Sequence, residues 1–480
     1  MSAPVISVAQ MQEWEKATWA TGITESAVIA RVGEIVANRI SRLVARGDSL
    51  VILAGQGHNG EDAHAALEHL MDRRVHLLSV TNPVQDITEL KDLLSLRPSL
   101  VVDGLFGTGL NRPLSPEWIQ FIQCLNDSQL PVLSIDVPSG LNAATGQPEG
   151  AAVKAAITLT LGGVKDGLLQ QAAWPYVNRL EVAREIGLVE CPFDNDLSWT
   201  QAADFYSFPP LRPSASHKGE FGKVAIIAGS FGYHGASVLA AQGAQRAQPG
   251  LITLFTQEMI YNTVASQLQA VMVSLWQPQV KFPLTFNSVL IGPGLADERL
   301  PDELKMSTRH IWRDSPGAVI VDATALDWVP IGPIAKNVIR VVTPHPGEAA
   351  RLLRWTIQQV QSNRLNALRE LSKRLGNCWV VLKGHQTLVG RSTGKVHINP
   401  SGNAHLAQGG SGDTLAGYLA GLLAQPALQA DPLKTICYGV WQHGAAADAL
   451  SANRRNWVVE DLTREIGNCR PGRYDEEAVL

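Results

Sequence analysis

Short apolar runs that end in glycine and polar residues recur along the chain, and they constrain its fold more than any other feature. In the first half these runs are 50–54, 100–102 and 132–135. Nearly continuous apolar runs of this length fit strands that are buried on both faces, as in parallel sheets. Ligands bind beyond the carboxyl ends of such strands, so the three polar clusters predict one ligand crevice. The pattern predicts an α/β fold.

A second series of apolar runs begins after residues 192–216, a stretch with several prolines and little periodicity, which we interpret as a linker or domain crossover. The runs of this second series are 224–228, 289–291, 318–321, 339–342 and 379–382. A chain of 480 residues is too long for one compact core. We therefore expect two layered α/β domains, over residues 1–205 and 206–480.

Charge and cysteine content exclude several classes of protein. There are 40 Lys and Arg against 44 Asp and Glu, a net charge of −4, so no basic surface for nucleic acid is expected. The five cysteines are scattered, without a C-x-x-C pair, which fits a reducing cytoplasm and neither a disulfide framework nor a cysteine zinc site. No signal peptide is recognisable, and no apolar run approaches the roughly 20 residues of a membrane span. We expect a cytoplasmic protein that binds anions through local features.

The glycine-rich segment 407–417 is the most specific candidate for anion binding. Gly410, Ser411 and Gly412 leave backbone amides accessible, and an apolar pattern of helical period follows at once. A glycine-rich turn that leads into a helix N-terminus favours phosphate, because free amides and the helix dipole both attract negative charge. Asp413 then stands where a carboxylate can accept a proton from an attacking hydroxyl. The alternative is that Asp413 is an ordinary residue of a first helical turn.

Other strand ends of the second half supply groups that suit phosphoryl transfer. Lys383 follows the run 379–382 and can neutralise phosphate charge, although a solvated lysine is the simpler alternative. His345 lies between two prolines, a position that also fits an ordinary loop histidine. No G-x-x-x-x-G-K-[ST] segment is present, so the chain is not a P-loop protein. Asp322 is interpreted as an architectural residue or as a group that supports a metal ligand, and not as the base.

Several motifs of the second half occur together in one known family. They are His-Lys-Gly-x-Phe-Gly at 217–222, the glycines of 229–236, Thr-Pro-His-Pro-Gly-Glu at 343–348, Lys-Gly at 383–384 and the segment 399–413. Over roughly residues 205–460 the chain resembles the ADP/ATP-dependent NAD(P)H-hydrate dehydratases, which have a ribokinase-like fold. Through 55–62, 103–113 and 136–142 the first half is similar to the Rossmann-like NAD(P)H-hydrate epimerase domain. The fused pair resembles bacterial bifunctional NAD(P)H-hydrate repair enzymes.

For the second half the resemblance implies dehydration of hydrated NADH and NADPH with ADP, or ATP, and Mg²⁺. Phosphoryl transfer to the ring hydroxyl would convert a poor leaving group into a good one. Asp413 is the expected base, with the amides of Gly410, Ser411 and Gly412 as the anion hole. By analogy the nucleotide contacts Lys383, Gly384, His385, Gln386 and Thr387, and the hydrate contacts Ala236, Gly294 and His345.

For the first half the resemblance implies exchange between the R and S epimers of the hydrate. The exchange develops positive charge on the ring, which a carboxylate such as Asp136 would stabilise. By analogy K⁺ binds Asn59, Asp103 and Ser139, although Asn and Asp at such positions also stabilise ordinary turns. The hydrate's phosphates are expected on His58, Asn59, Gly60, Glu61 and Asp62, and on Gly107, Thr108, Gly109, Leu110, Asn111, Arg112 and Pro113.

The first half also departs from its family. The usual Asn-Asn-Gly-Gly-Asp-Gly is here His-Asn-Gly-Glu-Asp-Ala at 58–63. Two glycines are lost, which matters if either position needs a positive φ, and Glu61 brings an anion to a phosphate site. A non-catalytic first domain that serves binding or assembly therefore stays open as an alternative. A second alternative is a small-molecule kinase of the same fold as the second domain. We expect a homo-oligomer.

Overall fold

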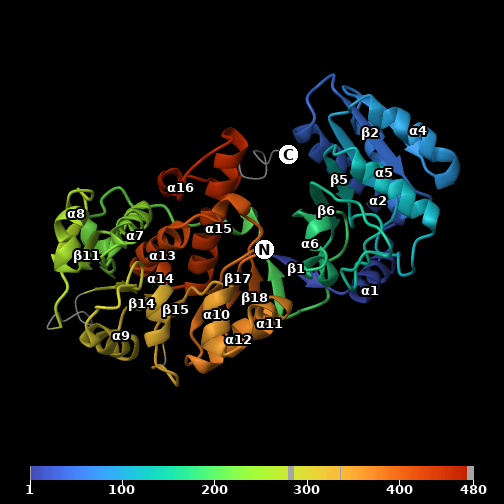
Figure 1. The fold of residues 1–480 in the computed structure, drawn as a ribbon. Helices are drawn as coiled ribbons and strands as arrows, with labels where there is room; N and C mark the ends of the chain where they lie inside the picture. The colour runs from blue at the N-terminus through green and yellow to red at the C-terminus, as the bar shows by residue number, and fades with distance from the viewer. Residues whose placement is uncertain (1, 279–285, 336, 473–480) are drawn as a thin grey trace. The chain divides into compact units, whose positions relative to one another are not determined.

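The computed structural model describes residues 2–278, 286–335 and 337–472 (Figure 1). Their contacts group residues 2–199 into one compact unit and the residues from 200 onward into another. Each unit contains a predominantly parallel sheet between helices, so the prediction of layered α/β architecture is confirmed. Within the described residues, no helix is both long enough and apolar enough to cross a membrane.

The N-terminal unit is built on a parallel sheet with the strand order β3-β2-β4-β5-β6-β8. Its strands are β1 (Ala3–Ile6), β2 (Ser49–Ala54), β3 (Arg74–Ser79), β4 (Leu100–Gly104), β5 (Val132–Ile135), β6 (Ile157–Leu161), β7 (Val164–Lys165), β8 (Arg179–Ala183) and β9 (Leu197–Trp199). Its α-helices are α1 (Val8–Trp19), α2 (Glu25–Leu43), α3 (His58–Ala65), α4 (Pro83–Ser95), α5 (Pro116–Asp127) and α6 (Trp174–Val177). Outside the main sheet, β1 pairs with β7 in parallel and with β9 antiparallel.

Alternation along β2 explains how helices cover both faces of this sheet. Leu50 and Ile52 pack in a buried cluster with α2, whereas Val51 and Leu53 pack with α4 and α5 on the opposite face (Figure 1). Successive side chains of a strand point to opposite faces, so an unbroken apolar run serves two helical layers at once. The sheet thereby directs its polar strand ends to one edge.

The C-terminal unit has the strand order β12-β11-β10-β13-β14-β15-β16-β17-β18, parallel as far as β16 and antiparallel from β16 to β18. Its strands are β10 (Lys223–Ile227), β11 (Leu251–Thr256), β12 (Met272–Leu275), β13 (Ser288–Ile291), β14 (Ala318–Val321), β15 (Arg340–Val342), β16 (Trp379–Leu382), β17 (Leu388–Gly390) and β18 (Val396–Ile398). Its α-helices are α7 (His234–Arg246), α8 (Tyr261–Ala265), α9 (Asp302–Asp314), α10 (Pro346–Leu353), α11 (Ile357–Ser362), α12 (Arg364–Arg374), α13 (Ser411–Leu423), α14 (Pro426–Gln429), α15 (Pro432–Asn453) and α16 (Val459–Glu465).

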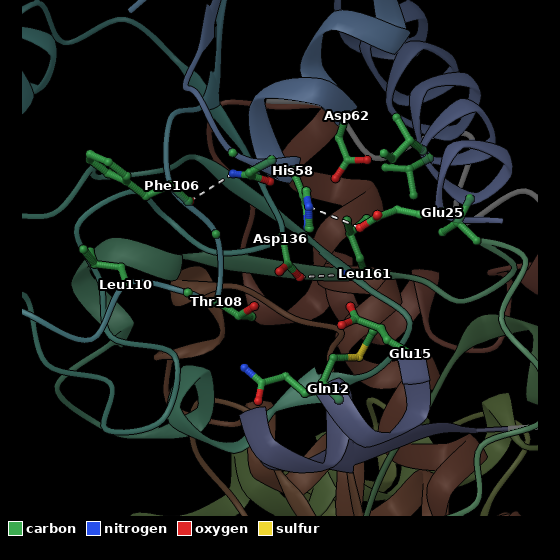
Figure 2. Close-up of a pocket in the computed structure, with 18 of the residues that line it drawn as sticks. Gln12, Glu15, Glu25, His58, Asp62, Phe106, Thr108, Leu110, Asp136 and Leu161 are labelled. Atoms are coloured by element: carbon green, nitrogen blue, oxygen red, sulfur yellow. Dashed lines mark hydrogen bonds and ion pairs between the residues drawn. The ribbon is translucent and has the colours of Figure 1, made fainter. Parts of the chain in front are cut away.

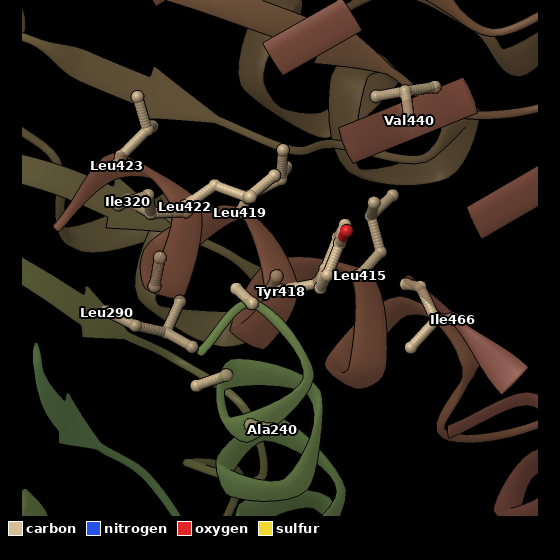
Figure 3. Close-up of a cluster of buried hydrophobic side chains, with 14 of the residues drawn as sticks. Ala240, Leu290, Ile320, Leu415, Tyr418, Leu419, Leu422, Leu423, Val440 and Ile466 are labelled. Carbon is tan, nitrogen blue, oxygen red and sulfur yellow. The ribbon is translucent and has the colours of Figure 1, made fainter. Parts of the chain in front are cut away.

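Helices α7 and α13 pack unusually closely in the core of this unit (Figure 3). A Cβ atom on Gly417 would lie 1.9 Å from the Ala240 carbonyl oxygen, and one on Gly421 would lie 2.6 Å from that of Ala244. From α7, a Cβ on Gly243 would lie 2.3 Å from the Thr414 carbonyl oxygen. These glycines are required by the close approach of two backbones, which leaves both helices fixed against each other.

The stretch 192–216 is more ordered than a linker. It contains β9 and a short 3₁₀ helix over Ala202–Phe205. Phe205 is buried with its ring centroid 5.5 Å from those of Tyr438 and Trp441, and this packing anchors the segment to α15. The lack of periodicity hid the order, because a short strand and one 3₁₀ turn are too brief to show a repeat.

Candidate active sites

The N-terminal unit contains a cavity of about 840 Å³ beyond the carboxyl ends of β2, β4 and β5 (Figure 2). Helices α1, α2 and α3 and the loop after β4 form its walls. Of the residues predicted from the family resemblance, the structure brings ten to this cavity: His58, Asn59, Asp62, Gly107, Thr108, Gly109, Leu110, Asn111, Arg112 and Asp136. The predicted crevice at three strand ends is therefore present as a cavity.

Gly60, Glu61 and Pro113 do not line it. A Cβ atom on Gly60 would lie 2.0 Å from the Gly55 carbonyl oxygen, so this glycine serves the close approach of α3 to the end of β2. Glu61 is exposed on α3 and lines a separate surface hollow. Neither Glu61 nor Ala63 has a positive φ, so the loss of the family's glycines costs no backbone strain at these positions.

Asp136 is held by three donors on one carboxylate oxygen. Its Oδ1 accepts hydrogen bonds from Lys165 Nζ at 2.5 Å, from the Leu161 amide at 3.0 Å and from Thr160 Oγ1 at 3.2 Å. Lys165 is fully buried and also donates to the Leu161 carbonyl at 2.7 Å. These donors bind Oδ1 and leave Oδ2 for the cavity. Sequence reasoning missed Lys165; its one signal was a lysine following an apolar strand and two glycines.

Further carboxyl groups surround the cavity. Asp62 is buried, and its pKa is raised to about 8 by burial and by the charges of Asp136, Glu61, Glu15 and Glu25. Burial also raises the pKa of Glu15. Glu15 and Glu25 were not predicted to lie at the site, because α1 and α2 are separate in the sequence from the strand-end motifs. His58 Nε2 lies 3.2 Å from Glu25 Oε1, which links α3 to α2.

The three residues predicted to hold K⁺ meet around the Phe106 backbone. Asn59 Nδ2 donates to the Phe106 carbonyl at 2.9 Å, and the Phe106 amide donates to Ser139 Oγ at 2.8 Å. Asp103 Oδ2 accepts from the Ser139 amide at 2.9 Å. Asn59 Oδ1 is buried without a hydrogen-bond partner in the part of the chain that the structure describes. A buried, unpartnered oxygen among oxygen donors fits a hard cation such as K⁺.

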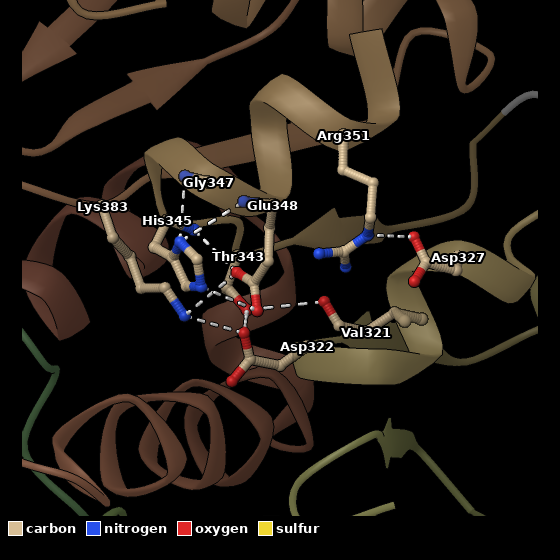
Figure 4. A network of polar contacts seen from close by, with 9 residues as sticks. All are labelled: Val321, Asp322, Asp327, Thr343, His345, Gly347, Glu348, Arg351 and Lys383. Carbon is tan, nitrogen blue, oxygen red and sulfur yellow. Dashed lines mark hydrogen bonds and ion pairs between the residues drawn. The ribbon is translucent and has the colours of Figure 1, made fainter. Parts of the chain in front are cut away.

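In the C-terminal unit, polar side chains from three strand ends form one network (Figure 4). Lys383 Nζ lies 2.9 Å from Asp322 Oδ1 and 3.9 Å from Glu348 Oε2. Asp322 Oδ1 also accepts from Thr343 Oγ1 at 2.7 Å, which supports its architectural role. Burial lowers the pKa of Lys383, but the nearby carboxylates more than offset this, so its pKa is raised and it stays charged. Glu348 is the last residue of the Thr-Pro-His-Pro-Gly-Glu motif, and no role was predicted for it from the sequence.

His345 joins this network through its own helix. It is the N-cap of α10, where its Nδ1 accepts from the Gly347 amide at 3.0 Å, and its Nε2 lies 3.4 Å from Glu348 Oε1. The structure therefore gives His345 a capping role, and its exposed ring keeps one edge open to solvent.

The glycine-rich turn delivers the N-terminus of α13 to Lys383. A Cβ atom on Gly412 would lie 3.3 Å from Lys383 Nζ and 3.9 Å from Asp322 Oδ2. Gly410 is the N-cap with φ +95°, a conformation that favours glycine. The pKa of Asp413 is raised to about 7 by burial and by Asp322, partly offset by Lys383. Such a value suits a general base near neutral pH.

A buried histidine, His443 of α15, supports this turn from behind. Its Nε2 lies 3.0 Å from the Ser411 carbonyl oxygen, and burial lowers its pKa to about 4. The ring is therefore neutral at pH 7, and Nε2 carries the proton because its partner is an acceptor. Ser411 Oγ in turn donates to the Leu406 carbonyl at 3.0 Å.

The predicted nucleotide loop, residues 383–387, is braced by Arg364, which the sequence did not single out. Its guanidinium donates to the carbonyls of Leu382 and Gln386, each at 3.2 Å, and to that of His385. Gly384 and Gln386 have positive φ, and Thr387 Oγ1 donates to the Gly384 carbonyl at 3.0 Å. One buried side chain thus holds a strained loop in shape.

Two of the three residues predicted to contact the hydrate, Ala236 and Gly294, come together, whereas His345 lies in the network around Glu348. A Cβ atom on Gly294, which has φ +66°, would lie 3.0 Å from the Ala236 Cβ and 2.5 Å from the Tyr233 carbonyl oxygen. Ser230 Oγ donates to the Gly294 carbonyl at 2.6 Å. Ala236 stands in the first turn of α7, next to α13.

In comparisons with known proteins, the two halves of the chain match different families. Residues 224–468 match the NAD(P)H-hydrate dehydratase family, and residues 74–167 match the family described as YjeF-related protein N-terminus. The chain is 32% identical over 503 residues to the bifunctional NAD(P)H-hydrate repair enzyme Nnr of Gloeobacter violaceus, covering 96% of each chain. It is 34% identical over 370 residues to that of Escherichia coli, covering 76% of this chain and 70% of the relative.

Among solved structures, a ribokinase-like superfamily protein from Enterococcus faecalis matches with a TM-score of 0.51 and 24% identity, over 59% of this chain and 98% of that one. This likeness confirms the ribokinase-like fold of the C-terminal unit. The sequence similarity to bifunctional repair enzymes extends over nearly the whole chain and establishes the family. The chain belongs to the bifunctional NAD(P)H-hydrate repair enzymes.

Proposed function

We propose that the two units repair hydrated NADH and NADPH in sequence. The N-terminal unit interconverts the R and S epimers, and the C-terminal unit dehydrates the S epimer with ADP, releasing AMP, phosphate and NAD(P)H. The observation that carries the proposal is the meeting of Asp413, Lys383 and the N-terminus of α13 at the strand ends of the C-terminal unit.

In the dehydratase step, the oxygen of the ring hydroxyl attacks the β-phosphorus of ADP. Asp413 accepts the proton of that hydroxyl group as the attack proceeds. The bond from that phosphorus to the AMP oxygen breaks. Lys383 and the amides of Gly410, Ser411 and Gly412 stabilise the charge on the transferring group. The ring nitrogen lone pair then expels phosphate, and loss of a proton from the neighbouring ring carbon restores the dihydropyridine.

The loop of residues 383–387, braced by Arg364, is placed to bind the nucleotide beside this centre. Ala236, Gly294 and His345 would hold the hydrate. The carboxylates of Asp322 and Glu348, near Lys383, offer the oxygen ligands that Mg²⁺ prefers. When bound, Mg²⁺ neutralises the nucleotide's phosphates.

In the epimerase step, the ring nitrogen expels the hydroxyl and water adds to the other face. The ionised Asp136 stabilises the positive ring, and the amides at the start of α3, at His58 and Asn59, are free for phosphate. Asn59, Asp103 and Ser139 would hold K⁺, which supplies a fixed positive charge beneath the loop after β4. The cavity with its bound carboxylate favours catalysis over a binding role for this unit.

The five free cysteines, two of them buried, support a reducing cytoplasmic location. A homo-oligomer is part of the same proposal, and sedimentation of the purified chain tests it.

The test is incubation of the purified chain with mixed NADH hydrate epimers, ADP and Mg²⁺, followed by chromatographic separation. Loss of both epimers faster than their spontaneous exchange, with AMP and NADH rising together, is expected. Loss of one epimer alone would leave the N-terminal unit as a binding domain. A stable phosphorylated product would instead identify a kinase. Repeating the assay with ATP, and with K⁺ replaced by Na⁺, tests the choice of nucleotide and cation.

A further inference from the structure

Asp62 differs from every other acidic residue of the N-terminal cavity. It is only 7% exposed, it lines the cavity, and within the described residues its carboxyl group has no hydrogen bond or ion pair. In Figure 2 the carboxyl group points into the space between α3 and Asp136. A buried carboxyl group without a partner is costly to ionise.

The surroundings of Asp62 increase this cost. The charged and titratable groups near it or along the same cavity are Glu15 and Lys16 of α1, Glu25 of α2, His58 and Glu61 of α3, Arg112, Asp136 and Lys165. Lys165 already has a carboxylate partner in Asp136, and His58 pairs with Glu25. Burial, and then the negative charges of nearby carboxylates, raise the pKa of Asp62 to about 8.

Asp62 and Asp136 therefore face one cavity from different surroundings. Three donors bind the Asp136 carboxylate, whereas burial among carboxylates keeps Asp62 protonated at neutral pH. Two carboxyl groups whose environments separate their proton affinities are the usual arrangement of an acid and a base in one active site.

We propose that Asp62 is the proton donor to the departing hydroxyl group in the N-terminal cavity. The inference rests on the proposed epimerase function. As the ring nitrogen lone pair forms a C=N bond, the carbon–oxygen bond breaks and the Asp62 proton passes to the hydroxyl oxygen, which leaves as water. Water then adds to the other face of the ring and gives a proton to Asp136. Proton transfer through solvent returns Asp136 to its ionised form and Asp62 to its protonated form.

In this role Asp62 faces the ring of the hydrate, and the phosphate expected at this segment is bound by other groups. Its carboxyl group would repel phosphate when ionised, and its amide lies inside α3. The amides at the N-terminus of α3 belong to His58 and Asn59, which lie one helical turn from Asp62. Phosphate and ring can therefore occupy different parts of the cavity.

The test uses the full-length chain with Asp62→Asn, which keeps the shape and removes the transferable proton. Exchange of the R epimer of NADH hydrate into the S epimer is expected to fall by about 100-fold in kcat at pH 7, with little change in KM. Asp62→Glu is expected to restore part of the rate. Glu68→Gln, an exposed carboxyl on the neighbouring 3₁₀ turn, is the matched control and is expected to exchange as the parent does.

Denaturant unfolding followed by Trp14 and Trp19 of the N-terminal unit reports whether each variant is folded. The pH profile of the parent gives an independent readout, because kcat for exchange should fall as pH rises through about 8. Parent-like kcat for Asp62→Asn, a loss confined to KM, or a parent profile that is flat to pH 9.5 would each overturn the assignment. Absence of exchange in the parent chain would overturn the epimerase function itself, a result distinct from these three.

Discussion

Each unit places a lysine against an aspartate at the edge of its sheet, but the two lysines differ in their freedom to bind other groups. Lys165 is fully buried, and its amine is bound to Asp136, Thr160 and the Leu161 carbonyl. Lys383 is partly exposed, contacts Asp322 and Glu348, and lies close to the backbone of Gly412. The bonds of Lys165 are all made within the protein, whereas in the proposed function Lys383 also binds an incoming phosphate.

Asp413→Asn should give the largest effect and should separate the two units. Without the base, dehydration of the S epimer is expected to fall by about 1,000-fold in kcat, because general base catalysis contributes factors of this order. Epimer exchange in the same sample should be unchanged. Dehydration within tenfold of the parent would show that the base lies elsewhere.

Lys165→Met tests whether the lysine of the N-terminal unit is structural. It leaves the Asp136 carboxylate buried without its cation, so a loss of about 3 kcal/mol in the free energy of unfolding of this unit is expected. Denaturant unfolding followed by the tryptophans, Trp14 and Trp19 among them, measures it. Lys383→Met should destabilise less, since its side chain is partly exposed, yet should lower the dehydration rate by about 100-fold. Equal destabilisation by the two substitutions would contradict the comparison.

Gly417→Ala asks how far the second site depends on the packing behind it. The added methyl group would meet the Ala240 carbonyl oxygen, so we expect a loss of about 2 kcal/mol in stability and a lower dehydratase kcat. Thermal unfolding and the two activity assays check this. Unchanged stability would mean that α7 and α13 can separate at little cost.

The smallest effect is the pH dependence, which should run in opposite directions in the two units. The pKa of Asp413 is raised to about 7, and a base must be ionised, so the dehydratase rate should rise with pH through 7 by up to tenfold per unit. The exchange rate should instead fall above about pH 8, where Asp62 loses its proton. Parallel profiles for the two activities would remove the distinction.

Sequence reasoning reached the parts of both sites that follow strand ends directly. The strands around Asp103, Asp136, Lys383 and the turn before Asp413 were located within two residues, because unbroken apolar runs have few alternative structures. Whether Asp413 and Asp136 carry the predicted chemistry stays a prediction. What the sequence did not show were groups whose role depends on tertiary contacts.

Arg364 and His443 illustrate the limit. Arg364 stands in an ordinary charged helix, and His443 in an apolar one, so neither has a local signal. Their importance arises only when folding brings them against backbone carbonyls of the 383–387 loop and of Ser411. The protonation of Asp62 is a property of the same kind, because it is set by burial in the folded unit and by carboxylates that lie far apart in the sequence.

The contact between α7 and α13 has a consequence for the rate of the reaction. In the proposed function, Ala236 in the first turn of α7 contacts the hydrate, and the amides in the first turn of α13 bind the transferring phosphate. Backbones in contact at Gly243, Gly417 and Gly421 cannot shift along each other without collision. The distance between hydroxyl and phosphorus is therefore set before either substrate arrives, and the translational entropy of bringing them together is lost on binding. Such an arrangement raises the effective concentration of the hydroxyl group far above any that free solution allows.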